Sequence, residues 1–160
     1  MIIRRAEVAD FDALWPILRD VFRAGDTYAV DPQISKHACF DYWMTQPTAT
    51  YVVETDEILG TYYIRTNQPG GGAHICNCGY IVAPNARGHG LAGQMCEHSQ
   101  DEARKLGYQA MQFNFVLASN EGAVRLWRRL GFETVGTIPN AFDHPNRGMV
   151  DAFLMYKRLE

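Results

Sequence analysis

The residues best suited to chemistry lie in a loop between a predicted strand and a predicted helix. From Tyr80 to Gly93 the chain reads YIVAPNARGHGLAG. The first N–H groups of a helix have no partner within it and lie at the positive end of its dipole, so they bind phosphate groups well. Gly88 and Gly90 permit close approach of a ligand, and Arg87 adds a positive charge. This loop predicts a phosphate or diphosphate site.

Two common nucleotide motifs fit this loop poorly. Gly88, Gly90 and Gly93 match the dinucleotide pattern G-x-G-x-x-G. That pattern also needs glycines directly after the strand and an acidic residue about 20 positions later. Here residues 83–87 intervene, and residues 106–120 contain no Asp or Glu. Because the dinucleotide pattern is incomplete, an NAD-dependent enzyme is the weakest functional hypothesis. A P-loop is excluded as well, because no Gly-Lys-Ser/Thr follows.

Composition narrows the class of protein. The chain has 160 residues, 47% of them hydrophobic, which predicts a single globular domain over 1–160 with its own core. Fifteen Lys and Arg and eighteen Asp and Glu give a net charge of −3, which argues against a general nucleic-acid binder. No apolar run approaches the roughly 18 residues of a membrane span, and residues 1–5 lack the order of a signal peptide.

The four cysteines favour a reducing compartment. Cys76 and Cys78 form C-x-C without the second Cys or His pair of a zinc site, and Cys39 and Cys96 are isolated. We therefore expect reduced thiols, no metal and a cytoplasmic location.

Hydrophobic spacing predicts the elements that position this loop. Leu91, Met95 and Ser99 recur at helical intervals, whereas Met111 and Phe113 alternate as in a strand. A run of strands followed by alternation with helices predicts a mixed α/β fold with a βαβ crossover. The expected helices are 10–23, 33–44, 90–106 and 120–130; the expected strands are 1–5, 50–54, 58–66, 74–82, 109–116, 132–138 and 149–158, with a loop at 139–148.

Two blocks in this order resemble a known family. The segment Arg87–Ala92, RGHGLA, fits [R/Q]-x-x-G-x-[G/A], and the segment 120–132 is similar to N-x-x-A-x-x-L-Y-x-x-x-G-F. Over about residues 78–136 the chain thus resembles the GNAT superfamily of acyl-CoA-dependent N-acetyltransferases. The resemblance implies a central mixed, mostly antiparallel β-sheet of about seven strands, flanked by about four helices, with a splayed parallel pair of strands in the middle.

The resemblance also implies a cosubstrate and its binding residues. Acetyl-CoA would lie along the strand that ends at Ile81 and Val82, whose backbone groups would bind the pantetheine amides. Asn120 would reach it from the next helix, and a homodimer is compatible with the family. Backbone N–H groups of the loop would bind the diphosphate: Arg87, Gly88, His89, Gly90, Leu91 and Ala92.

The implied enzyme moves an acetyl group from acetyl-CoA to the amine of a small molecule or amino-acid-like acceptor. Family members often have an acidic Tyr in the second block that protonates the leaving thiolate, and here this residue is Trp127. Indole lacks usable acidity, so Trp127 is expected in the core or the pocket wall. Three residues are candidates to replace the missing acid: Ser119, Tyr80 and Tyr156.

His74 is the candidate general base, because histidine titrates near neutral pH and His74 is expected on the face of Cys76 and Cys78. Glu54 is the second candidate. We expect the acceptor pocket to come from residues 22–31, the helix after Pro32, and the loop 141–148.

Two alternatives remain open at this point. One is a protein N-terminal or lysine acetyltransferase. The other is a non-catalytic acyl-CoA-binding or regulatory module, which Trp127 favours.

Overall fold

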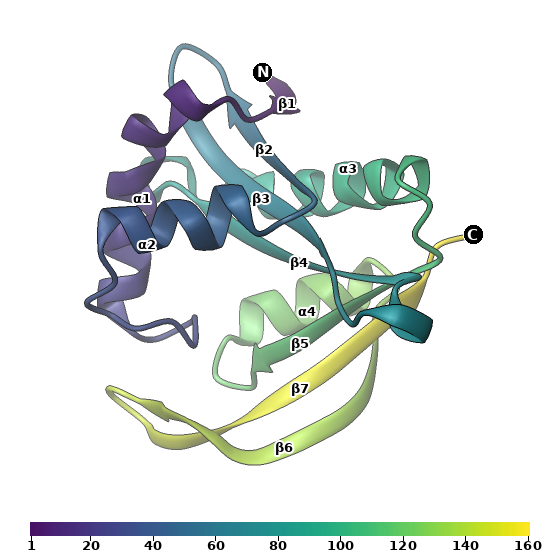
Figure 1. Ribbon diagram of the computed structural model, residues 1–160. Helices are drawn as coiled ribbons and strands as arrows, with labels where there is room; N and C mark the ends of the chain where they lie inside the picture. The colour runs from purple at the N-terminus through teal and green to yellow at the C-terminus, as the bar shows by residue number, and fades with distance from the viewer.

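A computed structural model describes all residues 1–160. Its strands form one seven-stranded sheet in the order β1-β2-β3-β4-β5-β7-β6 (Figure 1). All neighbouring strands are antiparallel except β4 and β5, which are parallel. The strands are β1 (Ile2–Arg5), β2 (Ala49–Glu54), β3 (Ile58–Thr66), β4 (Ile75–Val82), β5 (Ala110–Leu117), β6 (Glu133–His144) and β7 (Gly148–Arg158).

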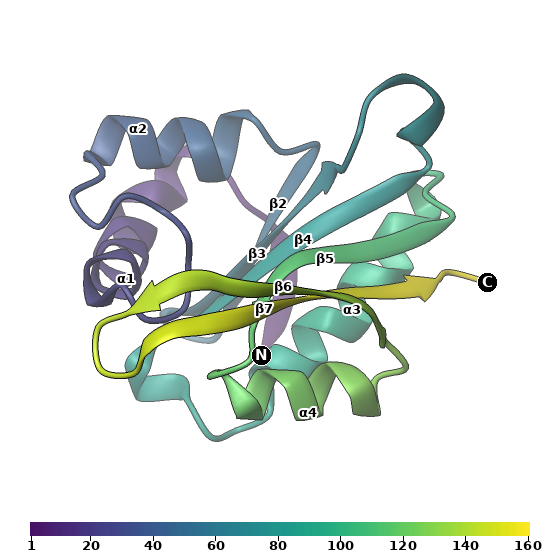
Figure 2. The same cartoon turned by 90° about the horizontal axis from the view of Figure 1, so that it is seen from below.

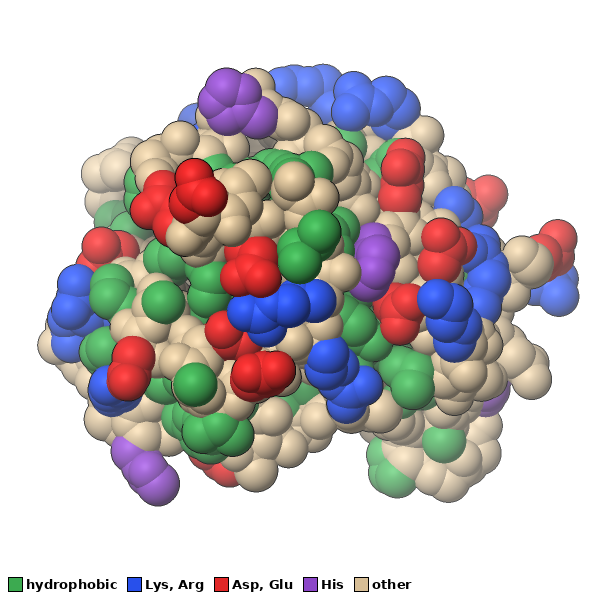
Figure 3. Space-filling model, turned by 90° about the horizontal axis from the view of Figure 1, so that it is seen from above, with side chains coloured by type: hydrophobic (Ala, Val, Ile, Leu, Met, Phe, Trp, Pro, Cys, Tyr) green, Lys and Arg blue, Asp and Glu red, His purple; other side chains and the backbone are tan.

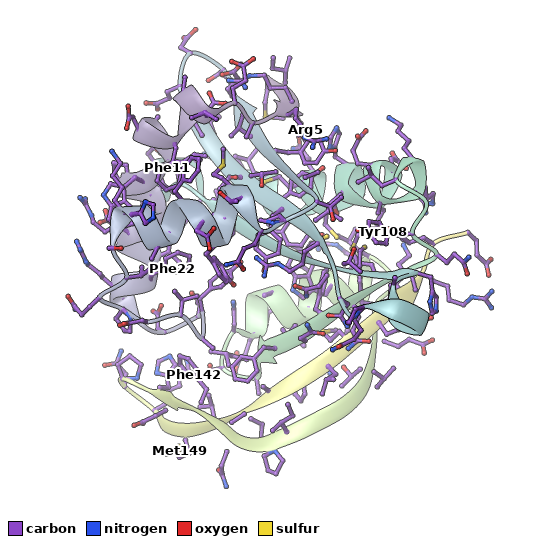
Figure 4. All side chains as sticks on the ribbon, viewed as in Figure 1. Arg5, Phe11, Phe22, Tyr108, Phe142 and Met149 are labelled. Carbon is purple, nitrogen blue, oxygen red and sulfur yellow. The ribbon has the colours of Figure 1, made fainter.

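Helices cover both faces of the sheet. On one face lie α1 (Phe11–Ala24) and α2 (Lys36–Phe40); on the other lie α3 (Leu91–Lys105) and α4 (Glu121–Arg129) (Figures 1 and 2). Alternate residues of β3 face the two different cores: Tyr62 packs in the core on the α3 side, and Tyr63 packs in the core on the α1 side. Figure 4 shows Phe11 and Phe22 on α1, both fully enclosed in the smaller core. The expected mixed α/β fold is confirmed.

The parallel pair β4–β5 opens along its length. The two strands pair only at Ile75–Ala110 and Cys76–Met111, near their start. A bulge in β5 follows Phe113, so Val116 instead of Phe115 joins Met111 and Phe113 in the core. The sheet therefore has a gap in its middle toward the C-terminal end of β4.

The expected loop at 139–148 is wrong over most of its length. β6 continues to His144 and β7 begins at Gly148, so only residues 145–147 join the two strands. A register shift between Ile138 and Phe142 accommodates Pro139 and Asn140, whose φ is 49°. Since β6 pairs only with β7, it is an edge strand, where proline costs no ladder hydrogen bond.

The helix expected at 33–44 is also shorter than predicted. α2 ends at Phe40, and a wider π-type turn continues over Asp41–Thr45. The other helices and strands begin and end within a few residues of their expected bounds.

The surface offers no single-sign charged region on the face drawn in Figure 3, where acidic and basic side chains are interspersed. None of the helices is both long enough and apolar enough to cross a membrane.

Candidate functional site

A cavity of about 1170 Å³ lies where β4 and β5 diverge. Its wall includes the loop after β4 and the first turn of α3 on one side of the sheet, and Tyr28 and Tyr42 on the other. The cavity therefore joins the α3–α4 side to the α1–α2 side through the gap in the sheet. Its volume is slightly above the range of about 300–1,000 Å³ that is usual for single-ligand pockets.

The α3–α4 end of the cavity is suited to a multiply charged anion. Gly88 and Gly90 have φ of 81° and 76°, a conformation that glycine adopts without strain. The amide of Gln94 donates to the carbonyl of Gly90 (3.2 Å), so the N–H groups of residues 91–93 have no helical partner. No acidic residue lies in this first turn. Arg87, Arg125 and Arg129 line the same cavity.

The backbone of β4 presents polar groups to the gap at alternate residues. Ala83, directly after β4, donates its N–H to the carbonyl of Leu59 in β3 (2.8 Å), so the odd-numbered residues of β4 direct their backbone N–H and C=O groups toward β3. The even-numbered residues Cys78, Tyr80 and Val82 then direct their N–H and C=O groups toward β5. Consistent with this, the Tyr28 hydroxyl donates to the Tyr80 carbonyl across 2.9 Å.

Trp127 forms an aromatic wall of the cavity with Tyr80 and Phe113. Its ring centroid lies 5.2 Å from that of Tyr80 and 5.1 Å from that of Phe113, and 8% of Trp127 is exposed. The structure therefore places Trp127 in the core and the pocket wall, as expected.

None of the three substitutes for the missing acid presents a free hydroxyl to the cavity. The Tyr80 hydroxyl bonds to Ser99 Oγ (2.7 Å), and burial raises the pKa of Tyr80 well above its usual value. Tyr156 and Ser119 are not among the lining residues.

The α1–α2 end of the cavity is aromatic with a single charged group. Tyr28, Tyr42, Tyr63 and Phe115 line it together with Arg65. The guanidinium carbon of Arg65 lies 4.9 Å from the ring centroid of Tyr42 and 4.4 Å from that of Tyr63. Its Nη2 donates to the Tyr42 carbonyl (2.9 Å), and its buried Nε has no hydrogen-bond partner.

Most of the predicted cosubstrate-binding residues line the cavity, and two do not. Ile81 is 3% exposed and packs in the α1–α2 core, and its odd position directs its backbone toward β3. His89 belongs to the loop between β4 and α3 but is exposed and does not line the cavity. The residues that do line it are Val82, Arg87, Gly88, Gly90, Leu91, Ala92 and Asn120. The Asn120 amide oxygen caps α4 by accepting from Ala123 N–H (3.4 Å).

Neither candidate base lies at the cavity. His74 is exposed in the turn before β4, roughly 25 Å of strand away from the loop that follows Val82. Glu54 pairs with Arg4 across 2.7 Å. β4 begins one residue after His74, so His74 lies outside the strand that carries Cys76 and Cys78. The cavity wall contains no His, Asp or Glu.

The hairpin of β6 and β7 reaches the cavity wall indirectly. Phe142, which Figure 4 labels on this hairpin with Met149, contacts Phe115 with a centroid distance of 6.3 Å. Neither His144 nor Arg147 lines the cavity. From the expected acceptor segment 22–31, only residues 27–30 line it.

Tyr42 comes from the expected acceptor segment after Pro32, whereas sequence reasoning missed Tyr63 and Arg65. Tyr63 and Arg65 alternate in the strand 58–66, so their shared face was predictable. Which face borders the gap in the sheet depends on long-range pairing, and no local signal gives it.

Comparisons with known proteins agree with this architecture. A model of the acetyltransferase (GNAT) family matches residues 11–132. The N-acetyltransferase aca1 of Schizosaccharomyces pombe is 30% identical in an alignment 148 positions long, which covers 81% of this chain and 71% of aca1. No group of three or more His, Cys, Asp or Glu side chains is arranged to hold a metal ion.

Solved structures share the whole fold. A GCN5-related N-acetyltransferase from Kribbella flavida superposes with a TM-score of 0.94 at 40% identity, covering 99% of this chain and 97% of that one. The structure of yncA from Salmonella typhimurium, solved with its cofactor acetyl-CoA, superposes with a TM-score of 0.86 at 22% identity, covering 100% of this chain and 94% of that one. The sequence resemblance is confirmed: the chain belongs to the acetyltransferase (GNAT) family.

Proposed function

We propose that this acetyltransferase moves the acetyl group of acetyl-CoA to the amine of a small, amino-acid-like molecule. One observation carries the proposal: a single cavity connects the start of α3, with its free N–H groups, to an aromatic end through the gap between β4 and β5. A long cosubstrate entering from α3 and a small acceptor entering from α1 would meet in that gap. The acetyl-CoA in the yncA structure supports the choice of cosubstrate.

The first step of the proposal is cosubstrate binding. The free N–H groups of residues 91–93 and the side chain of Arg87 would bind the diphosphate. Tyr80 and Val82 would bind the pantetheine amides as an added strand binds a sheet edge. We thus assign this role to Tyr80 in place of Ile81.

The second step is transfer. The neutral amine attacks the thioester carbonyl; a C–N bond forms and the C–S bond breaks, leaving a thiolate. An N–H group of β4 directed into the gap would stabilise the developing oxyanion. A thiol with a pKa near 8.5 is an adequate leaving group as the thiolate, so Trp127 need not supply a proton. Since the wall has no His, Asp or Glu, solvent water would take both protons that the nitrogen loses: one from the ammonium before attack and one after the C–N bond forms.

The test is a thiol-release assay with acetyl-CoA and a broad panel of amines, with N-acetylated products identified by mass spectrometry. The proposal predicts release with small amines and less with peptide N-termini or lysine peptides. Release only with peptides would contradict the small-molecule acceptor. Binding of acetyl-CoA without release on any amine would support the non-catalytic module, which the absence of a free acidic hydroxyl near Trp127 favours.

A further inference from the structure

We infer that the acceptor carries a carboxylate, and that Arg65 binds it and so selects amino acids over simple amines. This inference rests on the proposed transferase function and names the substrate class of the same site. It starts from a positive charge in the cavity wall that the chain itself leaves without a counter-ion.

Arg65 is half-buried and forms none of the ion pairs of the structure. Arg4 is the useful contrast, since Asp10 and Glu54 flank it at 2.8 and 2.7 Å. The Nε atom of this half-buried guanidinium is enclosed without a hydrogen-bond partner, which costs the fold some stability. An anionic ligand in the cavity would supply the missing partner.

The position of Arg65 separates it from the diphosphate end. In the sheet it is paired with Asn77 of β4, five residues before Val82 and therefore roughly 17 Å of strand away from the loop. Arg65 shares its side of the sheet with Tyr63, which belongs to the core on the α1 side. The ring of Tyr63 packs against Tyr42 and Trp43 in the turn that follows α2. Arg87, Arg125 and Arg129 serve the opposite end, so Arg65 is the charged residue of the acceptor end.

The neighbours of Arg65 hold its planar guanidinium group in one orientation. The rings of Tyr42 and Tyr63 lie within 5 Å of its guanidinium carbon, and the Tyr42 carbonyl accepts from Nη2. A fixed guanidinium matches a carboxylate with parallel hydrogen bonds. Because no Asp or Glu lines the cavity, the carboxylate would anchor the acceptor while the amine stays unpaired and free to lose its proton.

The experiment compares matched acceptors that differ in one group. Free phenylalanine, leucine and methionine are assayed against their carboxamides, with acetyl-CoA saturating. For the wild type we expect kcat/KM to favour the amino acid by about 100-fold in at least one pair, because one buried charge pair is lost with the amide. The lower ammonium pKa of the amide works against this result.

Arg65→Gln should reduce that preference to within about threefold while leaving the KM for acetyl-CoA unchanged. Arg65→Lys keeps the charge but loses the paired N–H donors of the guanidinium, so it should retain part of the preference for the amino acid. Arg19 is a half-buried arginine of α1 that pairs with Asp20 and does not line the cavity, so Arg19→Gln should leave the preference intact. Even if Arg65→Gln fails to fold, the comparison of amino acids with their carboxamides in the wild type tests whether the acceptor needs a carboxylate.

Equal or faster acetylation of the carboxamides by the wild type would overturn the inference and leave the transferase function standing. A folded Arg65→Gln protein that keeps the full preference would overturn it as well. No release with any member of the panel would instead contradict the proposed function, and the inference with it.

Discussion

At the scale of single residues, Trp127 separates two views of the chemistry. If it only forms the wall with Tyr80 and Phe113, Trp127→Phe should keep kcat within about threefold, since no proton passes through the indole. Trp127→Ala should cost about 3–5 kcal/mol of unfolding free energy, because it opens a cavity in the core. Steady-state kinetics and urea unfolding measure both. A loss of more than 100-fold in kcat for Trp127→Phe would show that the indole takes part in catalysis.

His74 gives a second prediction at this scale. Since it lies outside the cavity, His74→Ala should leave kcat/KM within about twofold of the wild type. The pH profile should then rise with the deprotonation of the acceptor amine, whose own pKa sets the midpoint. A shift of the profile in His74→Ala, with the same acceptor, would restore the histidine as general base.

At the scale of elements, α3 carries a pH-sensitive contact. His98 Nδ1 hydrogen-bonds to the Tyr62 hydroxyl (2.7 Å), and burial lowers the pKa of His98 below its usual 6.5, against the opposing effect of Glu102 and Asp101. Lys105 acts in the same direction as burial. The folded protein therefore binds fewer protons here than the unfolded chain does.

This depressed pKa has a definite sign for stability. The contribution of His98 is complete above about pH 6.5 and is lost as the pH falls through the lower pKa of the folded state. The wild type should lose more Tm between pH 7.5 and 5.0 than His98→Gln does. His37→Gln, an exposed control on α2, should behave like the wild type. Parallel Tm losses in all three proteins would contradict the prediction.

Elements were predictable from the sequence where local pattern determines them. The strand 58–66 was expected with its observed bounds, and α3 was read from its apolar spacing and its glycines. The C-terminal end of β6 was not predictable, because Pro139 and Asn140 are turn formers in sequence but are tolerated in an edge strand. The bulge after Phe113, which redirects Phe115, has no local signal either.

At the scale of the whole molecule, the loop could be predicted, but the acceptor end only in part: the segments of Tyr28 and Tyr42 were expected there, and Arg65 was not. Gly88 and Gly90 act through their own backbone and the helix that follows, so neighbouring residues in the sequence reveal them. Arg65 acquires its place because β3 lies beside a strand that diverges from its parallel partner. Such proximity depends on the topology of the entire sheet, which single-sequence patterns do not encode.

The central claim is that the start of α3 binds the diphosphate of acetyl-CoA, and calorimetric titration of two glycine variants tests it most directly. Gly90 and Gly107 both have positive φ, 76° and 91°, and open space where a side chain would begin. Replacing either by Glu therefore imposes a similar backbone strain, about 1–2 kcal/mol. Only Gly90 lines the cavity.

Gly90→Glu should weaken acetyl-CoA binding by at least about 100-fold, because its carboxylate meets the diphosphate. Gly107→Glu should bind within about twofold of the wild type. Unchanged affinity in a folded Gly90→Glu protein, or an equal loss in both variants, would contradict the account.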